Sequence, residues 1–269
     1  MTPSSLLLVG CGKMGGALLE RWQQSTLIER FDVIEPQYAA PGSRVTWHRN
    51  LESLPPDYVP DVVVFAVKPQ HLDAVLPAYK IRFGNANPLY ISIAAGKKLS
   101  FYASHLGERA HIVRAMPNTP AMVGEGMTVL CSAPTLPASA KKIALDLMSA
   151  VGKAEWLPNE SLMDAVTAIS GCGPAYVFLF LESMVKAGVA VGLPEDMAKI
   201  LSCQTVLGSL KLAAQSGKTL EQLRIQVASP GGATEAALNI LMQSNNLQSL
   251  LEKAVDSATA RSKQLSEKN

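Results

Sequence analysis

The sequence predicts an α/β chain with a doubly wound parallel sheet followed by an all-helical domain. Three observations predict it: short apolar runs alternate with helical patterns up to about residue 158, a G-x-G-x-x-G turn follows the first run, and strand-like runs stop afterwards. Near-continuous apolar runs are typical of strands covered on both faces, and strand–helix alternation gives a parallel sheet with right-handed crossovers. We therefore expect a sheet domain over residues 1–158 and an all-helical domain over residues 159–269.

The first domain is built from short apolar runs and the helical patterns between them. The expected strands are residues 6–10, 31–35, 61–67, 88–94, 111–115 and 126–131, with 44–47 a weaker candidate. The expected helices are residues 14–25, 69–79, 99–106 and 137–152. The segment 153–158 closes the domain.

The second domain shows helical periodicity alone. From Asp196 onward the apolar residues keep an i, i+3, i+4 rhythm typical of one buried helix face. Helix boundaries are expected at Pro174, at Gly192 with Pro194, at Gly217, and at residues 229–232. We expect the tail, residues 261–269, to be frayed, and we expect the helical domain to pair with a second copy of itself.

Composition excludes several classes of protein. The 269 residues are 48 % apolar and 17 % charged, and 24 Lys plus Arg against 22 Asp plus Glu leave a net charge of +2, without a basic run for nucleic acid. The four cysteines lie far apart, so neither a metal site nor a disulfide framework is expected. We expect no membrane span and a cytoplasmic location, because no signal peptide is recognisable and the most apolar stretch, residues 165–181, is short and contains Gly and Pro.

The glycine-rich turn is the first functional signal. Its residues are Gly10, Cys11, Gly12, Lys13, Met14 and Gly15. After a strand and before a helix, the first glycine permits the tight turn, the second lets the backbone approach a pyrophosphate, and the third allows close packing of helix on strand. The free N–H groups of the helix then face the phosphates. This context predicts a Rossmann-type domain that binds a dinucleotide.

Glu35 bears on which dinucleotide binds. It ends the second expected strand, 20 residues after Gly15, where a carboxylate can bind the ribose 2′-OH. Because it would repel a 2′-phosphate, it favours NADH over NADPH. Two alternatives remain open: Glu35 as a solvated carboxylate at a strand end, and Arg44 or Arg49 as a partner for a 2′-phosphate.

Further cofactor contacts are expected at the carboxyl edge of the sheet, where ligands of such sheets bind. The loop after the strand 61–67 contains Ala66, Val67, Lys68 and Pro69. The loop after the next strand contains Ala94, Ala95 and Gly96, whose small side chains would let a nicotinamide ring lie against the backbone. The second loop reads equally well as an ordinary turn of small residues.

A second glycine-rich string, SPGGAT, opens a helical pattern in the second domain. Ser229 suits an N-cap and Pro230 the first helical position. The two glycines that follow cost about 1 kcal/mol each relative to alanine, which indicates a close approach to the backbone. A small carboxylate is the natural guest at such a helix start, and an unusually sharp helix entry is the alternative.

Four strings combine with the glycine-rich turn: AVKP at 66–69, MPNTPA at 116–121, SGCGPAY at 170–176 and SPGGAT at 229–234. Together the chain resembles pyrroline-5-carboxylate reductase. The resemblance implies a Rossmann domain followed by a helical domain that interleaves with a partner. It also implies reduction of the cyclic imine 1-pyrroline-5-carboxylate to L-proline by NADH or NADPH, with the chain acting as a homodimer or higher oligomer.

The resemblance also assigns residues. It implies that the substrate carboxylate lies on the backbone amides around Gly232, Ala233 and Thr234, within a site that includes Ser229 and Gly231. It places a substrate-contacting carboxylate at Glu160 and a cofactor-contacting amide at Asn50, although a Glu in a first helical turn and an N-cap Asn are ordinary alternatives.

The polar loop after the strand 111–115 and the proton balance of the reaction can be argued from the residues themselves. Asn118 and Thr119, bracketed by prolines, form a stiff polar loop that could bind the nicotinamide carboxamide. The helical domain contains no histidine, and a protonated imine needs no enzymic acid to accept hydride. We therefore expect catalysis mainly by alignment. The resemblance implies that the Thr234 hydroxyl lies close to the ring nitrogen, so we expect Thr234 to be the catalytic group that hydrogen-bonds it.

This chain departs from the family at two positions. Cys172 stands where serine is usual, and Glu35 stands where many relatives carry Asn, Ser or Arg. The rival enzyme, a β-hydroxyacid dehydrogenase, needs a lysine four residues after the glycine pair, where this chain has Val177. A non-catalytic NAD(P)-sensing module is the rival outside enzymes, but it would not need the SPGGAT site. We expect the break at Gly171, Gly173 and Pro174 to lie near the active site.

Overall fold

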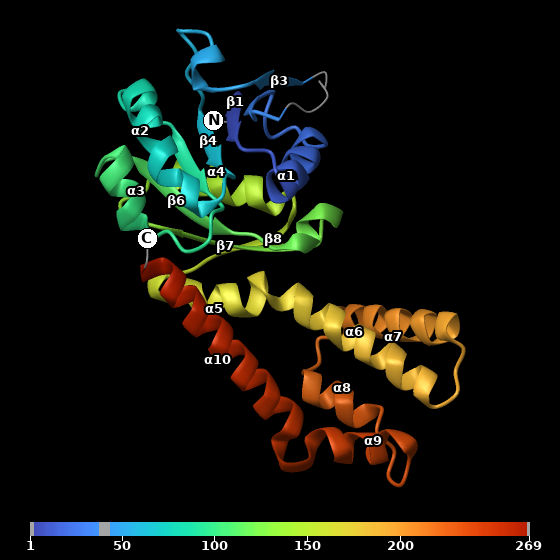
Figure 1. Cartoon of the computed structure of the whole chain (residues 1–269). Helices are drawn as coiled ribbons and strands as arrows, with labels where there is room; N and C mark the ends of the chain where they lie inside the picture. The colour runs from blue at the N-terminus through green and yellow to red at the C-terminus, as the bar shows by residue number, and fades with distance from the viewer. Residues whose placement is uncertain (1–2, 38–43, 268–269) are drawn as a thin grey trace. The chain divides into compact units, whose positions relative to one another are not determined.

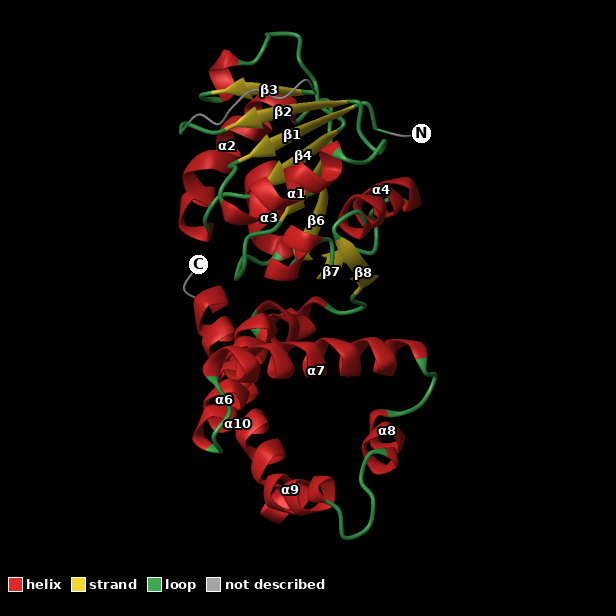
Figure 2. Ribbon diagram, turned by 90° about the vertical axis from the view of Figure 1, so that its right-hand side faces the viewer, coloured by secondary structure: helices red, strands yellow, loops and turns green. Residues whose placement is uncertain are grey.

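The computed structural model describes residues 3–37 and 44–267, which form two compact units. The first unit contains residues 1–172 together with 258–269, and the second contains residues 173–257. An eight-stranded sheet with the order β3-β2-β1-β4-β5-β6-β7-β8 forms the centre of the first unit (Figure 2). Its strands are β1 (Ser5–Val9), β2 (Arg30–Ile34), β3 (Val45–His48), β4 (Val62–Phe65), β5 (Leu89–Ser92), β6 (His111–Met116), β7 (Gly126–Ser132) and β8 (Gly152–Trp156).

The sheet is parallel except between β6 and β7. The predicted parallel sheet is therefore confirmed for its first six strands, while β7 runs against β6. The reason is the connection: only nine residues, 117–125, join the two strands, and a parallel crossover needs a dozen or more. The segment 153–158, expected only to close the domain, supplies most of the edge strand β8.

Helices cover both faces of the sheet (Figure 1). They are α1 (Lys13–Gln23), α2 (Leu72–Phe83), α3 (Leu99–Leu106) and α4 (Ala138–Ser149). On one face α1 and α4 meet, and the indole N–H of Trp22 donates to the carbonyl of Leu147 at 2.8 Å. On the other face, α2 and α3 bury Tyr79 and Tyr102. The predicted doubly wound architecture is present.

The two units do not divide at residue 158. The segment that follows β8 consists of η4 (Glu160–Leu162), α5 (Met163–Val166) and the π-helical turn η5 (Thr167–Gly171), and it belongs to the first unit. Its carboxylate and carbonyl oxygens bond to the sheet domain: Glu160 pairs with Arg114, and the carbonyl of Ser170 accepts from Asn118. The expected break at Gly171 to Pro174 is this π-turn, directly before α6.

The C-terminal helix returns to the first unit. α10 (Asn246–Glu267) remains helical through residues 261–267, so the expectation of a frayed tail is wrong there; residues 268–269 lie outside the described part of the chain. Ser262 is buried, and its hydroxyl donates to the carboxylate of Asp164 at 2.6 Å. Ser266 donates to the same carboxylate oxygen at 3.3 Å. These bonds tie the last turns of α10 to α5.

The second unit is helical, as predicted. Besides the first part of α10, it contains α6 (Gly173–Ala190), α7 (Glu195–Gln215), α8 (Leu220–Gln226), α9 (Ala233–Met242) and η6 (Gln243–Asn245). Gly192 and Pro194 separate α6 from α7, as expected, and Thr219 starts α8 with a capping box to Gln222. α6 and α7 lie close enough that a Cβ on Gly188 would be 3.1 Å from the Cβ of Ala198.

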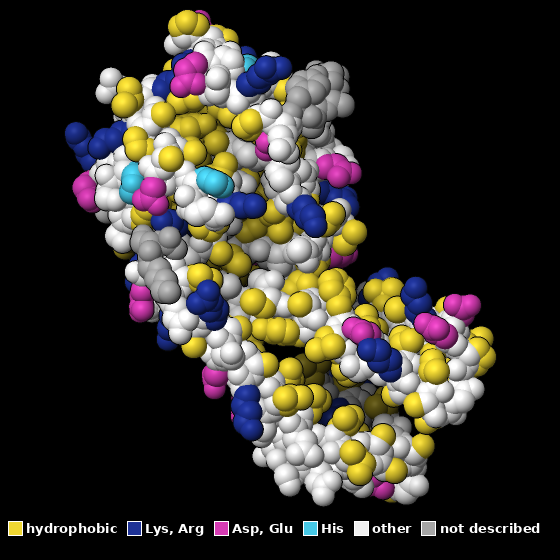
Figure 3. Space-filling view, in the orientation of Figure 1, with side chains coloured by type: hydrophobic (Ala, Val, Ile, Leu, Met, Phe, Trp, Pro, Cys, Tyr) yellow, Lys and Arg dark blue, Asp and Glu magenta, His cyan; other side chains and the backbone are white. Residues whose placement is uncertain are grey.

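The helices of the second unit leave large apolar side chains exposed (Figure 3). Phe178 is 64 % exposed, Ile200 62 % and Leu210 61 %. The helix over Glu160–Ala190 is also long and apolar enough to cross a membrane by composition alone, with a mean hydropathy of 1.4. One such helix is weak evidence for a membrane span.

Candidate active site

The glycine-rich turn lies between β1 and α1, as predicted. Gly10 has φ +87°, and a Cβ there would lie 2.9 Å from Cγ1 of Val67 and 3.1 Å from the carbonyl of Ala66. A Cβ on Gly15 would lie 2.7 Å from the Gly10 carbonyl oxygen. Gly12 is the N-cap of α1, with no side chain bonded to the free N–H groups. The turn is therefore a tight cradle whose helix N-terminus can accept an anion.

A cavity of about 710 Å³ opens beside this turn at the carboxyl edge of the sheet. Among the predicted cofactor residues, those that line it are Gly10, Gly12, Glu35, Asn50, Ala66, Val67 and Lys68. The sequence did not indicate the other lining residues Val9, Ile34, Pro36, Gln37, Leu51, His71, Ala74, Val75, Ala78 and Tyr79. The lining residues Ala74, Val75 and Ala78 carry no motif, and they are exposed or half-buried rather than part of the buried face of α2, so no local pattern indicated them. Polar groups from three strand ends thus converge on one hollow large enough for part of a dinucleotide.

The Glu35 carboxylate is held against the glycine-rich turn. Its Oε2 accepts from the backbone N–H of Cys11 at 2.8 Å, and its Oε1 accepts from the N–H of Gln37 at 3.2 Å. Burial, with the negative charge of Glu35 as a second cause, raises the pKa of the Cys11 thiol to about 11. Glu35 is therefore an ordered acceptor at the edge of the cavity rather than a freely solvated carboxylate.

The guanidinium of Arg44 is hydrogen-bonded to backbone carbonyls. Its guanidinium donates to the carbonyls of Gln23 and Ser25 at 3.0 Å each, and also to the Ile28 carbonyl. These bonds hold the connection between α1 and β2. Arg44 is thus not free to bind a 2′-phosphate, whereas Arg49 lines the cavity.

Asn50 combines the two functions that the sequence left open. Its Oδ1 accepts from the N–H of Ser53 at 3.0 Å, which caps η1 (Leu51–Ser53), and the same residue lines the cavity. Lys68 is the N-cap of η2 (Pro69–His71), with Pro69 in the first helical position. Both loops are therefore braced where the cavity begins.

The loop with Ala94, Ala95 and Gly96 follows β5 and is braced by a lysine that sequence reasoning missed. Lys97 is 1 % exposed; its ammonium donates to Asp73 at 3.1 Å and lies 4.0 Å from the ring centre of Phe101. Because a lysine is rarely buried, no local pattern predicts this contact. The loop is therefore followed directly by a buried, paired lysine.

Glu160 faces the sheet domain. Its Oε1 accepts from the N–H of Leu99 at 2.7 Å and pairs with the guanidinium of Arg114. Arg114 is buried in β6 and was not predicted. The structure thus gives this carboxylate oxygen two partners within the first unit, at the start of α3.

Asn118 is hydrogen-bonded at both ends of its side-chain amide. Its Oδ1 accepts from the N–H of Met127 at 2.8 Å, and its Nδ2 donates to the carbonyl of Ser170 at 3.1 Å. Thr119 begins the short helix η3 (Thr119–Val123) and is exposed. The polar loop after β6 is therefore ordered by Asn118 itself.

The SPGGAT string forms a turn before α9 in the second unit. The expected N-cap, Ser229, is wrong: Gly232 is the N-cap and the helix begins at Ala233. The reason is local, since Gly231 adopts φ +70° and the N–H of Gly232 donates to the Ser229 carbonyl at 3.0 Å, which closes a turn first. The N–H groups of Ala233 and Thr234 remain at the helix start, where no side chain caps them.

A carboxylate already lies at this turn. Oε2 of Glu235 accepts from the N–H of Gly231 at 2.8 Å. One backbone donor of the turn, the N–H of Gly231, is thus bonded to a carboxylate of the chain itself.

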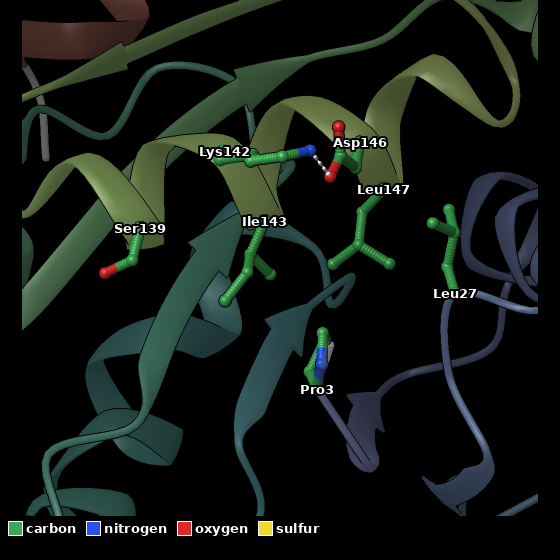
Figure 4. Close-up of a pocket in the computed structure, with 7 residues that line it drawn as sticks. All are labelled: Pro3, Leu27, Ser139, Lys142, Ile143, Asp146 and Leu147. Atoms are coloured by element: carbon green, nitrogen blue, oxygen red, sulfur yellow. Dashed lines mark hydrogen bonds and ion pairs between the residues drawn. The ribbon is translucent and has the colours of Figure 1, made fainter. Parts of the chain in front are cut away.

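A further hollow of about 260 Å³ lies against α4 (Figure 4). Its lining includes Pro3, Leu27 and Ile143, and its charged side chains, Lys142 and Asp146, bond to each other at 2.6 Å. With both charges paired, this hollow offers no site comparable to the cavity beside Glu35. In residues 3–37 and 44–267, no cluster of three or more His, Cys, Asp or Glu side chains suited to a metal was found.

Comparison with known proteins identifies the family. The model for pyrroline-5-carboxylate reductase dimerisation matches residues 160–265, and the model for the coenzyme F420-dependent NADP oxidoreductases matches residues 5–96. A pyrroline-5-carboxylate reductase of Methanosarcina acetivorans is 35 % identical over 265 residues, 97 % of each chain. This chain belongs to the pyrroline-5-carboxylate reductase family. The corresponding enzyme of Pseudomonas aeruginosa is 42 % identical over 207 residues, 77 % of this chain and 75 % of that one.

Solved structures of the family share the fold over nearly the whole chain. The reductase of Coxiella burnetii is 32 % identical with a TM-score of 0.90, and that of Plasmodium falciparum, solved with NADP bound, is 34 % identical with a TM-score of 0.86. Each comparison covers 99 % of both chains. Family membership favours the reductase interpretation over the β-hydroxyacid dehydrogenase and the sensing module.

Proposed function

We propose that this chain reduces 1-pyrroline-5-carboxylate to L-proline at the expense of a reduced nicotinamide dinucleotide. The observation that carries the proposal is the pair of turns described above: a glycine cradle beside a 710 Å³ cavity in the sheet domain, and a second helix start that holds a carboxylate. The first suits a dinucleotide and the second suits a small acid. The names of the relatives support the same reaction.

The cavity residues fit the cofactor. Gly10 and Gly12 leave room for a pyrophosphate at the N-terminus of α1, and Glu35 with Asn50 lies at the edge where a ribose would bind. Beyond the cavity, we propose that Thr119 and the loop of Ala94, Ala95 and Gly96 border the nicotinamide. When bound, the reduced nicotinamide supplies the hydride for the imine carbon.

The protein's own contribution is alignment. The N–H groups of Ala233 and Thr234 would hold the substrate carboxylate, and the Thr234 hydroxyl would bond the ring nitrogen. The imine arrives as an iminium, so the nitrogen already carries its proton and the two electrons of the hydride complete the amine. Glu160, whose Oε1 is occupied by Arg114 and Leu99, would contribute negative charge rather than a transferable proton.

We propose further that NADH is the preferred cofactor. The carboxylate of Glu35 is ordered by Cys11 and Gln37, and a 2′-phosphate beside it would meet like charge. Arg44, one of the two candidate phosphate partners, is occupied by backbone carbonyls. The relative of Plasmodium falciparum with NADP bound is the opposite precedent, so the preference rests on Glu35 itself.

The test of this preference is kcat/KM for NADH and NADPH in the wild type and in Glu35→Ser. We expect the wild type to favour NADH and the substitution to shift the ratio towards NADPH by about tenfold, which corresponds to about 1.4 kcal/mol of removed repulsion. Asp61→Asn is the control, because Asp61 directly precedes β4, at the edge of the sheet opposite to the cavity. We expect it to leave the ratio of kcat/KM for NADH and NADPH unchanged. A wild type that prefers NADPH by a large factor contradicts the proposal.

We also propose a homodimer or larger homo-oligomer in the cytoplasm. The exposed apolar side chains of α6 and α7 provide a surface that a second copy could cover, and the family model of residues 160–265 is named for dimerisation. Light scattering tests the assembly, and a monomer at working concentration would rule it out.

The reaction itself is tested by following cofactor oxidation with 1-pyrroline-5-carboxylate and identifying the product. We expect stoichiometric L-proline, and no oxidation with an α-keto acid as the control substrate. Cofactor binding without turnover of the imine would instead indicate the sensing module.

A further inference from the structure

The chain leaves the carbonyl of Ser170 without a helical donor. In an α-helix this carbonyl would accept from the N–H of residue 174, but that residue is proline, which has no N–H and whose ring crowds the same carbonyl. The helix widens here into the π-turn η5, closed by the bond from the Cys172 N–H to the Thr167 carbonyl at 2.9 Å. Such turns inside α-helices are rare and concentrate at functional sites.

Asn118 supplies the missing donor from the end of β6. Its Nδ2 donates to the Ser170 carbonyl at 3.1 Å while its Oδ1 accepts from the Met127 N–H at 2.8 Å. Because a backbone N–H only donates and a carbonyl only accepts, these two bonds determine the orientation of the amide. Nδ2 also lies 3.4 Å from the hydroxyl oxygen of Ser170, so both ends of the amide are engaged with the two segments that it joins.

A second contact joins the same two segments. A Cβ on Gly171 would lie 2.6 Å from Cε of Met116, so the π-turn and the end of β6 touch directly. The strings MPNTPA and SGCGPAY, which are 49 residues apart at their closest ends (121 and 170), are therefore one bonded unit.

We infer that Asn118 is a positioning residue for the reduction: it holds the Ser170 to Gly171 turn through the carbonyl that Pro174 leaves unpaired. It acts on the helix that continues from this turn and not on the cofactor. The inference rests on the proposed reductase function for its kinetic readout, but the bond itself can be tested without activity.

The first experiment compares Asn118→Asp with Asn87→Asp. Aspartate at 118 keeps an acceptor for Met127 but loses the donor to Ser170. Asn87 makes the matching pair of bonds at the start of β6, from Nδ2 to the Arg109 carbonyl at 3.1 Å and from the His111 N–H to Oδ1 at 3.4 Å. We expect kcat for imine reduction to fall about tenfold in Asn118→Asp and to stay unchanged in Asn87→Asp. A tenfold loss matches the free-energy cost of leaving a buried carbonyl without a donor. The Kd for NADH should stay within about twofold of the wild-type value.

The second experiment is a double-mutant cycle with Pro174→Ala, which returns an N–H to residue 174. In that background the Ser170 carbonyl has a helical donor, so we expect Asn118→Asp to lower kcat by less than about threefold. Equal losses in both backgrounds would overturn the inference, because Asn118 would then act through another group.

Hydrogen exchange separates the inference from the function. We expect amides of residues 167–180 to exchange about tenfold faster in Asn118→Asp than in wild type or Asn87→Asp, whether or not the imine is reduced. Unchanged exchange overturns the inference. A raised Kd for NADH in Asn118→Asp also overturns the inference, because Asn118 would then be a cofactor ligand. If the wild type is active and Asn118→Asp lowers Tm while kcat stays unchanged, the inference fails as well, because Asn118 would then only stabilise the fold. If the wild type fails to reduce the imine, the proposed function fails while the exchange result stands.

Discussion

The two glycine-rich turns are alike in what they present and unlike in why they need glycine. Each precedes a helix without a side-chain cap, and each holds a glutamate oxygen on a backbone N–H at 2.8 Å, Glu35 on Cys11 and Glu235 on Gly231. At Gly10 a Cβ would collide with the neighbouring strand end, whereas at Gly231 nothing lies within 4 Å.

The difference separates packing from conformation. Gly10 is required by its surroundings and by its positive φ, while Gly231 is required by its φ of +70° alone. The glutamates differ as well, since Glu35 reaches its turn from the end of β2 and Glu235 from the first turn of α9. The first turn is therefore packed against a neighbouring strand end, and the second has open space around its first glycine.

The largest expected effect comes from the same substitution at both turns. Gly10→Ala combines left-handed strain with overpacking and should lower the free energy of unfolding by about 3 kcal/mol. Gly231→Ala carries the strain alone and should cost about 1 kcal/mol. Urea denaturation monitored by circular dichroism measures both, and equal losses would contradict the distinction between the two turns.

The next effect concerns the open turn. Thr234→Ala removes the hydroxyl proposed to bond the ring nitrogen and should lower kcat/KM by roughly 10²-fold. Thr234→Ser keeps the hydroxyl and serves as the control, with most of the activity retained. A loss below threefold in the alanine variant would remove Thr234 from the mechanism.

A smaller effect concerns Glu235, the carboxylate bonded to the turn before α9. Glu235→Gln removes a negative charge that competes with the substrate carboxylate for backbone donors, so the KM for 1-pyrroline-5-carboxylate should fall about threefold. The Kd for NADH should stay the same. A raised KM would show that Glu235 supports the turn rather than competing at it.

The smallest effect concerns Glu35, the carboxylate bonded to the turn between β1 and α1. Because burial and then the charge of Glu35 raise the pKa of Cys11 to about 11, its thiol stays protonated at pH 8 and should react slowly with iodoacetamide. Glu35→Gln removes one cause, lowers that pKa and should speed the reaction about threefold. Exposed Cys203 is the internal control, and an unchanged ratio of the two rates would mean that Glu35 does not act on this turn.

Local patterns in the sequence predicted most of the fold. Continuous apolar runs and helical periods predict the order of strands and helices, because burial on two faces or one face leaves a direct trace in the sequence. The antiparallel direction of β7 left no such trace, since an apolar strand has the same pattern whichever way it runs. Its only signal was the short connection after β6.

The site was predictable where a motif acts through its own backbone, as at Gly10 and Gly12. It was not predictable where a side chain finds its partner across the fold. Asn118 bonds Ser170, Glu160 meets Arg114, and Lys97 is buried beside Asp73, each over a separation that no periodicity encodes. Ser229 failed as an N-cap because a positive φ two residues later closed a turn first.

The hydrogen bonds from Ser262 and Ser266 to Asp164 determine which fragments of the chain keep the first unit complete. A fragment that stops at residue 172 would contain every strand yet lose the two hydroxyls that satisfy the Asp164 carboxylate, and with them the Leu265 backbone that packs 3.6 Å from the Cβ position of Gly96. A fragment meant to keep the first unit whole therefore needs residues 258–269 joined to it, because these last turns of α10 belong to that unit.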